Sequence, residues 1–165
     1  MTENPKHFEG NKKVPFGDVP GIVEAELSLA FAEGAMKYSA YNYRQDPIRA
    51  SDYYSAVRRH LTEFWELGED VDATCGISHL TKAMACLAIL RDAQINEMII
   101  DDRPPPVPRS AWERLSSIAN DLRVRFPNPK PRFTGRPSNV VVARVEFECL
   151  KDLWTASSST GNTEE

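Results

Sequence analysis

The placement of proline most strongly limits how this chain can fold. Eight of the twelve prolines lie between Pro104 and Pro137. Those at positions 104–106 and 108 cannot continue a helix and favour an extended linker. The sequence therefore predicts two parts, a helix-rich domain over residues 1–103 and a Pro-rich extension over residues 104–165. We expect the extension to be an oligomerisation arm with a frayed Ser/Thr/Gly/Glu-rich end.

Composition excludes several classes of partner. The 165 residues include 20 Lys and Arg against 24 Asp and Glu, a net charge of −4, which argues against a nucleic-acid surface or a polybasic membrane patch. No apolar run approaches the roughly 20 residues of a membrane span, and the first ten residues are polar rather than signal-like. Three cysteines without a C-x-x-C motif fit a reducing cytoplasm, the host cytoplasm if the chain is phage-encoded. We expect a cytoplasmic protein.

Periodic apolar residues predict three long helices in the first part, over residues 21–38, 51–67 and 77–98. Ser51 is the expected N-cap of the second helix, and Gly68 its stop. The middle of the third helix is apolar all round, so we expect this helix to be central and buried. The fold class is therefore mainly α.

The extension shows two further elements. Ser110 and Glu113 have the spacing of a capping box that opens a short helix ending near Leu122. Alternating apolar and polar residues predict a strand over 139–150. A lone strand needs a partner, either residues 122–126 or another subunit. Because the third helix also has two opposed apolar faces, we predict a homo-oligomer, a dimer or a tetramer.

The second helix has a polar stripe that contains Glu63, Glu66, Arg59 and Asp52. Carboxylates at positions i and i+3 of an α-helix have Cβ atoms about 5–6 Å apart. Such oxygen ligands suit Mg²⁺ or Mn²⁺. The alternative is a solvated face opposite a core face.

An acidic turn follows directly after the second helix. Glu69, Asp70 and Asp72 repel one another, and the negative end of the helix dipole increases that repulsion, so a bound cation would relieve it. The alternative is that Asp72 or Thr74 caps the third helix while the other acidic residues are solvated.

Two polar residues lie on a small-residue face of the third helix. His79 and Lys82 share this face with Ala83 and Cys86, and a buried position requires partners for both. Carboxylates on a facing helix would satisfy them. A structural histidine is the alternative for His79.

The segment after the first helix combines cations, phenols and an amide: Lys37, Tyr38, Tyr41, Asn42, Tyr43 and Arg44. Lys and Arg for phosphate, together with carboxylates for Mg²⁺, are the recurring parts of nucleotide chemistry. The tyrosines would stack on a base, or the segment is a turn with ordinary surface aromatics. No P-loop, G-x-S-x-G or H-E-x-x-H motif is present to support another mechanism.

These motifs together resemble a known family. Glu63-x-x-Glu66, a twelve-residue loop and His79-x-x-Lys82 resemble the two-helix signature of the all-α NTP pyrophosphatases, the MazG-like superfamily. Further stretches resemble its phage dATP/dGTP diphosphohydrolase (MazZ-like) branch: residues 34–38 with 42–44, 59–61, and 68–72 with 76–80. The basic lead-in over residues 9–13 also resembles the family's N-terminal element. The resemblance covers residues 7–95.

The resemblance implies a MazG-like helical bundle that oligomerises and binds two or three Mg²⁺ or Mn²⁺ ions. The implied reaction converts a purine deoxynucleoside triphosphate, dGTP or dATP, to the monophosphate and pyrophosphate. In the phage branch the dGMP supplies 2-aminoadenine nucleotide synthesis. Residues and resemblance together assign catalysis to Glu63, Glu66 and Lys82, metal binding to Glu63, Glu66, Asp70, Asp72 and His79, and substrate binding to Lys12, Lys13, Lys37, Tyr38, Asn42, Tyr43, Arg44 and Arg59.

The chain departs from the superfamily pattern at three positions. Thr62 replaces the leading acid of E-E-x-x-E, and His79 and Lys82 replace the acids of E-x-x-D. Asp70 and Asp72 are then candidates to complete the metal site, while Lys82 contacts phosphate or an acidic ligand. The alternatives are a nucleotidase that releases orthophosphate and a non-catalytic helical adaptor whose Pro-rich arm binds a partner.

Overall fold

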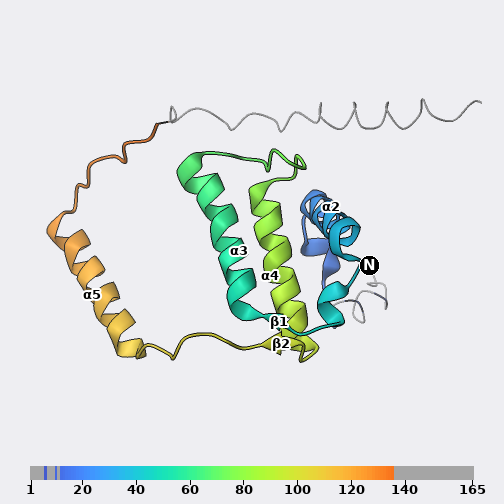
Figure 1. The fold of residues 1–165 in the computed structure, drawn as a ribbon. Helices are drawn as coiled ribbons and strands as arrows, with labels where there is room; N and C mark the ends of the chain where they lie inside the picture. Colours follow the sequence, from blue (N-terminus) through green and yellow to red (C-terminus); the bar gives the residue numbers. More distant parts are fainter. Residues whose placement is uncertain (1–5, 7–9, 11, 136–165) are drawn as a thin grey trace, which may run out of the picture. The chain divides into compact units, whose positions relative to one another are not determined.

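The computed structural model describes residues 6, 10 and 12–135 and divides the chain into two compact units, Met1–Pro104 and Pro105–Glu165 (Figure 1). The prediction of a mainly α fold is confirmed in the described part. The strand predicted over 139–150 lies outside the described residues. The first unit contains η1 (Phe16–Asp18), α2 (Gly21–Tyr38), η2 (Asn42–Arg44), β1 (Ile48–Arg49), α3 (Ala50–Thr62), η3 (Glu63–Leu67), α4 (His79–Ile95) and β2 (Ile99–Ile100), and the second contains α5 (Arg109–Arg125).

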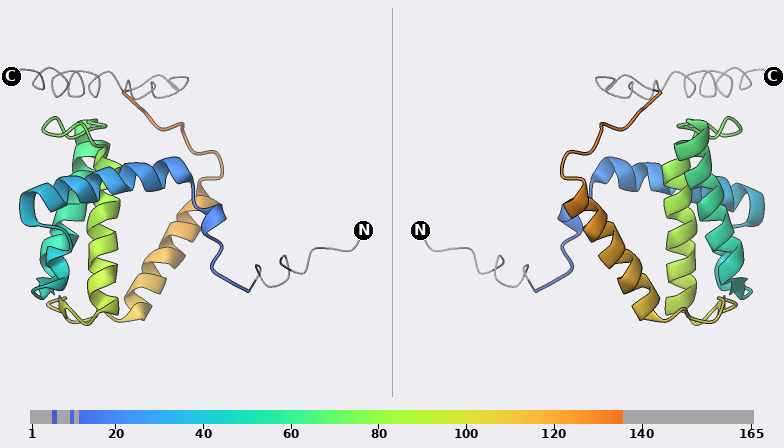
Figure 2. Two further views of the ribbon diagram at one scale, coloured as in Figure 1. Left: turned by 90° about the vertical axis from the view of Figure 1, so that its right-hand side faces the viewer. Right: turned by 90° about the vertical axis from the view of Figure 1, so that its left-hand side faces the viewer.

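Helix α4 is the centre of the first unit. It packs against α3 on one side and α2 on the other, and α2 runs across the antiparallel α3–α4 pair (Figures 1 and 2). Small side chains are buried in these helices, which allows close approach of the backbones: Ala30, Ala50, Ala83, Ala85 and Ala93. The expected central position of this helix is confirmed.

The start of α3 differs from the expectation. The helix begins at Ala50, and Ser51 is not its N-cap. Instead, the Asp102 carboxylate accepts hydrogen bonds from the Ser51 backbone N at 2.9 Å and the Ser51 Oγ at 2.6 Å. The short parallel pairing of β1 with β2, Ile48 opposite Ile99, brings Asp102 to this helix end. A distant carboxylate therefore takes the capping role that local sequence assigned to Ser51.

The second helix ends in a π turn. Residues 63–67 form η3, and Gly68, at φ 73°, ends the helix as predicted. A π turn closes hydrogen bonds from i to i+5 and is wider than an α turn, so residues i and i+3 are turned further apart around the helix axis than in an α-helix. Glu63 is accordingly half-buried and Glu66 exposed.

The acidic turn folds as a small hairpin. Val71 and Ser78 form an antiparallel bridge, and the Asp72 backbone N donates to the Ile77 O at 2.9 Å. Gly76 adopts φ 71°, which glycine tolerates without a side-chain clash. Ser78, rather than Asp72 or Thr74, caps α4 through its Oγ. The helix therefore begins two residues later than predicted.

The second unit contains the amphipathic helix α5. It begins at Arg109 after Pro108 and has no side-chain cap, so the predicted capping box at Ser110 is wrong. A proline at the N-cap fixes the backbone where no amide hydrogen bond is needed. All residues of α5 are exposed, including the apolar Trp112 and Leu115. No helix in the described residues is long and apolar enough to cross a membrane.

Candidate active site

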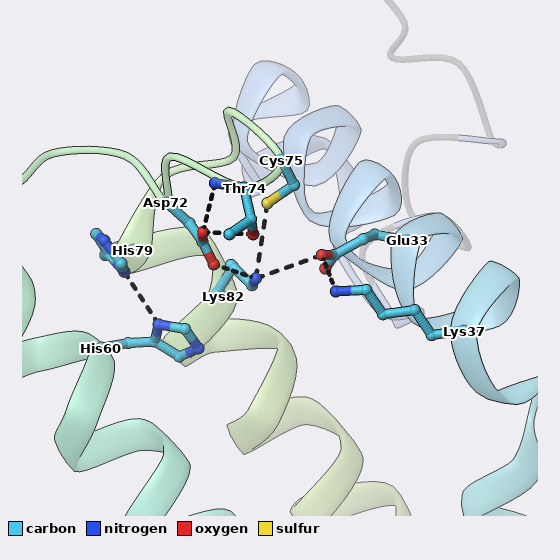
Figure 3. A network of polar contacts seen from close by, with 8 residues as sticks. All are labelled: Glu33, Lys37, His60, Asp72, Thr74, Cys75, His79 and Lys82. Carbon is cyan, nitrogen blue, oxygen red and sulfur yellow. Dashed lines mark hydrogen bonds and ion pairs between the residues drawn. The ribbon is translucent and has the colours of Figure 1, made fainter.

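A series of alternating charges joins three segments of the first unit (Figure 3). Lys82 of α4 places its Nζ 2.6 Å from Asp72 Oδ2 and 3.4 Å from Glu33 Oε1, and Glu33 of α2 also accepts a hydrogen bond from Lys37. The expectation that a facing helix supplies a carboxylate for Lys82 is confirmed. Burial opposes the charge of Lys82, but the hydrogen bond to Asp72 and the charges of Cys75 and Glu33 outweigh it and raise the pKa of Lys82.

The two carboxylates of this network are held in their ionised form. Hydrogen bonds from Lys82 and then from the Thr74 hydroxyl hold the pKa of Asp72 well below its usual range. Thr74 donates to Asp72 Oδ1 from its Oγ1 at 2.6 Å and from its backbone N at 2.9 Å, which fixes the carboxylate within the turn. Burial raises the pKa of Glu33, but the neighbouring Lys37 and Lys82 together lower it further, to below its usual value.

A pair of histidines links α3 to α4 beside this network. The Nδ1 atoms of His60 and His79 lie 3.0 Å apart, so one ring donates and the other accepts. Burial, and then the charge of Lys82, lower the pKa of His60. The His79 ring is 5 % exposed, and its Nε2 has no hydrogen-bond partner among the described residues. A buried imidazole nitrogen of this kind is a candidate ligand for an additional group.

The predicted metal ligands are only partly brought together. Asp72 is bound to Lys82, and His79 contacts His60, while on the π turn Glu63 is half-buried and Glu66 exposed. Among the described residues, no three His, Cys, Asp or Glu side chains form a group that could hold a metal. Mg²⁺, however, is usually bound by one or two carboxylates together with substrate phosphates. Glu63 itself is half-buried.

A cavity of about 480 Å³ lies against the end of α2 and the following loop. Its walls combine aromatic rings, small residues and polar groups, including Phe31, Gly34, Tyr38, Asn42 and Tyr43. A neighbouring cavity of about 330 Å³ shares Tyr38 and Asn42 and extends to α3. These volumes are typical of small-molecule sites. The predicted substrate residues Tyr38 and Asn42 therefore do line a pocket.

The loop of this pocket is held in a strained conformation. Ser39 and Tyr41 adopt φ of 74° and 58°, unusual values for residues with a Cβ. The Arg44 guanidinium secures the loop because it donates two hydrogen bonds to Asp92 of α4, at 2.8 and 2.5 Å, and lies 5.0 Å from the centre of the Tyr41 ring. Surrounding contacts therefore impose the backbone shape of the pocket.

Two predicted substrate residues, Tyr43 and Arg44, make contacts within the protein. Tyr43 is buried, and its ring centre lies 6.3 Å from that of Phe31. Both Oδ atoms of Asp92 are used by Arg44. Of the remaining candidates, Lys12 and Lys13 are exposed in the lead-in, and Arg59 is exposed on α3.

Sequence reasoning missed three participants: Glu33, His60 and Asp92. Glu33 had one usable signal, its position four residues before Lys37, which is the spacing of a helical ion pair. His60 falls within residues 59–61, which resemble the family, but nothing local identified the contacts of His60 and Asp92, because their partners are 19 and 48 residues away in the sequence.

The fold and the site define a class: a mainly α-helical domain that combines an aromatic pocket with a partly buried charge network. Comparison with known protein families shows which family this chain belongs to. The family model described as dATP/dGTP diphosphohydrolase, N-terminal, matches residues 3–103, and the chain belongs to this family. The resemblance noted from the motifs is thereby confirmed. The family name specifies a diphosphohydrolase of deoxynucleoside triphosphates.

No curated protein and no solved structure gives a significant match to this chain.

Proposed function

We propose that this protein is a metal-dependent deoxynucleoside triphosphate pyrophosphohydrolase that converts dGTP or dATP to the monophosphate and pyrophosphate. One observation supports this most directly. In a chain of the dATP/dGTP diphosphohydrolase family, the helix α2 that carries Glu33 and Lys37 also supplies Gly34 and Tyr38 to a pocket completed by Asn42. A base-sized pocket and a cation on one helix are parts that nucleotide binding requires.

In this proposal the purine occupies the pocket and the phosphates extend toward Lys37. The Tyr38 and Tyr41 rings offer stacking surfaces, and the Asn42 amide offers both a donor and an acceptor to base edges. The half-exposed Lys37 ammonium meets the charge of the phosphate tail. The dGMP product is a suitable precursor for 2-aminoadenine nucleotide synthesis, and we include that role in the proposal.

The proposed cofactors are Mg²⁺ or Mn²⁺ ions, two or three in number, held by Glu63 and Glu66 with Asp70, Asp72 and His79 as further candidates. A bound divalent ion neutralises phosphate charge and lowers the pKa of a coordinated water. Glu63 and Glu66 would hold the cation, and water would attack the α-phosphorus, with pyrophosphate as the leaving group. Asp72 takes part only if the cation displaces Lys82, because its carboxylate is already paired.

A panel of the eight common NTPs and dNTPs with Mg²⁺ or Mn²⁺ tests the proposed function. Anion-exchange analysis of the products should show a nucleoside monophosphate and pyrophosphate in equal amounts, with purine deoxynucleotides hydrolysed fastest. Orthophosphate as the released product would identify a nucleotidase instead. Absence of hydrolysis, with no rise in melting temperature on adding Mn²⁺ and dGTP, would support the adaptor alternative.

We also propose that the protein is a homo-oligomer. Leu80 and Leu87 lie two turns apart on α4 and are both exposed, and Leu61 of α3 and Trp65 of η3 are exposed as well. Helical periodicity places Leu80 and Leu87 on one face of α4. A second copy of the chain would cover this apolar face, and the Pro-rich extension over residues 104–165 would act as the oligomerisation arm.

A further inference from the structure

The ammonium group of Lys82 is saturated by protein acceptors. An ammonium has three N–H donors. The Nζ of Lys82 lies 2.6 Å from Asp72 Oδ2, 3.4 Å from Glu33 Oε1 and 3.6 Å from Cys75 Sγ, and only 14 % of its side chain is exposed (Figure 3). All three donors therefore have acceptors within the protein. A phosphate could gain a contact with Lys82 only by displacing one of these three groups.

Lys37 has the opposite arrangement. Half of its side chain is exposed, and its Nζ donates to the same atom, Glu33 Oε1, that faces Lys82. Among the described residues, Glu33 is its hydrogen-bonding partner, which leaves two donors available to a ligand. Lys37 itself lines neither cavity, whereas Tyr38, the next residue along α2, lines both. Of the two lysines, Lys37 is the one placed to receive an anion.

The order of charges makes the two lysines interdependent. Along the network the charges alternate from Asp72 to Lys82, Glu33 and Lys37, so each inner group separates two like charges. Without Lys82, the carboxylates of Asp72 and Glu33 would repel each other and Glu33 would move. Because Glu33 is the hydrogen-bonding partner of Lys37, a displaced Glu33 would leave the Lys37 ammonium unrestrained.

We propose that Lys82 is a positioning residue: it fixes Glu33, and Glu33 in turn holds the Lys37 ammonium where it binds the phosphate tail of the substrate. The proposal rests on the proposed function, since it assigns that tail to Lys37. It also gives Lys82 a role that differs from direct phosphate contact. Glu33, which no motif singled out, becomes the shared acceptor on which the arrangement depends.

Replacement of Glu33 gives the most discriminating test. If Lys37 and Lys82 bound phosphate independently, Glu33→Gln would remove a nearby negative charge and tighten anion binding. If Glu33 positions Lys37, the same substitution weakens anion binding. The probe is inorganic tripolyphosphate with Mg²⁺, titrated into the full-length chain by calorimetry. We expect Glu33→Gln to weaken binding about tenfold, the size of one charge-assisted hydrogen bond. Unchanged or tighter binding would overturn the proposal.

A double-mutant cycle provides the second measurement. We expect Lys82→Met and Lys37→Met each to weaken tripolyphosphate binding about tenfold, and the double variant to be no weaker than either single one, because both act through the same contact. Additive losses would show two independent phosphate contacts and would overturn the proposal. Lys130→Met, which removes a lysine from the second unit, is the matched control and should bind like the wild type.

The two proposals fail in distinguishable ways. Tripolyphosphate binding requires no turnover, so the cycle is informative even if the panel of triphosphates shows no hydrolysis. A wild-type chain that binds tripolyphosphate but releases no pyrophosphate contradicts the proposed function alone. A wild-type chain that hydrolyses dGTP, yet whose Lys82→Met variant binds tripolyphosphate normally while folded by circular dichroism, contradicts the positioning role alone. If Lys82→Met does not fold, Glu33→Gln decides.

Discussion

Helices α4 and α5 have the same length, 17 residues each, and opposite surroundings. Helix α4 has helices packed on two sides and buries small residues, with Ala93 fully covered. Helix α5 has an apolar stripe of large residues, yet every one of its residues is exposed. The pattern of α4 predicts burial and its packing provides it. The pattern of α5 also predicts a contact, which the described part of its own unit does not supply.

The difference in packing between α4 and α5 indicates which helix can hold a functional site. Packing on two sides fixes the side chains that α4 presents, so Lys82 and His79 meet partners from α2, α3 and the intervening loop. Rigid elements of this kind position reacting groups better than exposed ones. Helix α5 instead presents an exposed apolar surface.

The largest expected effect concerns turnover. We expect Glu63→Gln and Glu66→Gln each to lower the rate of triphosphate hydrolysis at least about 100-fold, because each removes a charge that a metal requires while side-chain volume is kept. Glu113→Gln, the same change on α5, should leave the rate unaltered. Steady-state assays of variants whose melting temperatures match that of the wild type provide the measurement. Wild-type rates in both Glu63→Gln and Glu66→Gln would contradict the proposal that η3 binds a metal.

A smaller effect is expected on stability. Ala93 is 0 % exposed, so Ala93→Leu should overpack the first unit and lower its free energy of unfolding by about 1–3 kcal/mol. The same change at the exposed Ala119 of α5 should have almost no effect, since Ala and Leu have similar helix propensities. Urea denaturation compares the two variants. Equal losses would mean that α5 is packed as tightly as α4.

Self-association tests the exposed stripe of α5. We expect Trp112→Asp to weaken the oligomer several-fold, because it places a charge in an apolar contact, whereas Ser117→Asp on the polar side should not. Deletion of residues 104–165 should lower the oligomer order before it abolishes triphosphate hydrolysis. Light scattering at micromolar concentration gives the mass. A monomeric full-length chain would contradict the predicted assembly.

The smallest expected effect is a dependence of stability on pH. The pKa of His60 in the folded chain lies below its ordinary value of 6.5, so between these two values the unfolded state binds more protons. The folded state is therefore not penalised by His60 above about pH 6.5, and its stability declines as the pH falls from there through the lower pKa that His60 has in the folded chain. We expect a fall in melting temperature between about pH 7 and pH 5 that is smaller in His60→Phe. Identical profiles would exclude His60 as the source.

Much of the fold follows from local pattern. The bounds of α2, the stop at Gly68 and the central position of α4 could all be predicted, because apolar periodicity and glycine at positive φ are local properties. The cap of α3 could not, since Asp102 reaches Ser51 only after β1 pairs with β2. The same holds for the π turn, where no glycine or proline signals the change in helix type.

For the site, the sequence by itself determined which chemical groups are available. It supplied the carboxylates of Glu63 and Glu66, the lysines Lys37 and Lys82, and the family motifs that the comparison confirmed. Only the tertiary structure decided their roles. Glu33 faces Lys82 across 49 positions of sequence because α2 packs on α4. Periodicity reports which face of a helix is buried, whereas the partner of a buried charge depends on which helix covers that face.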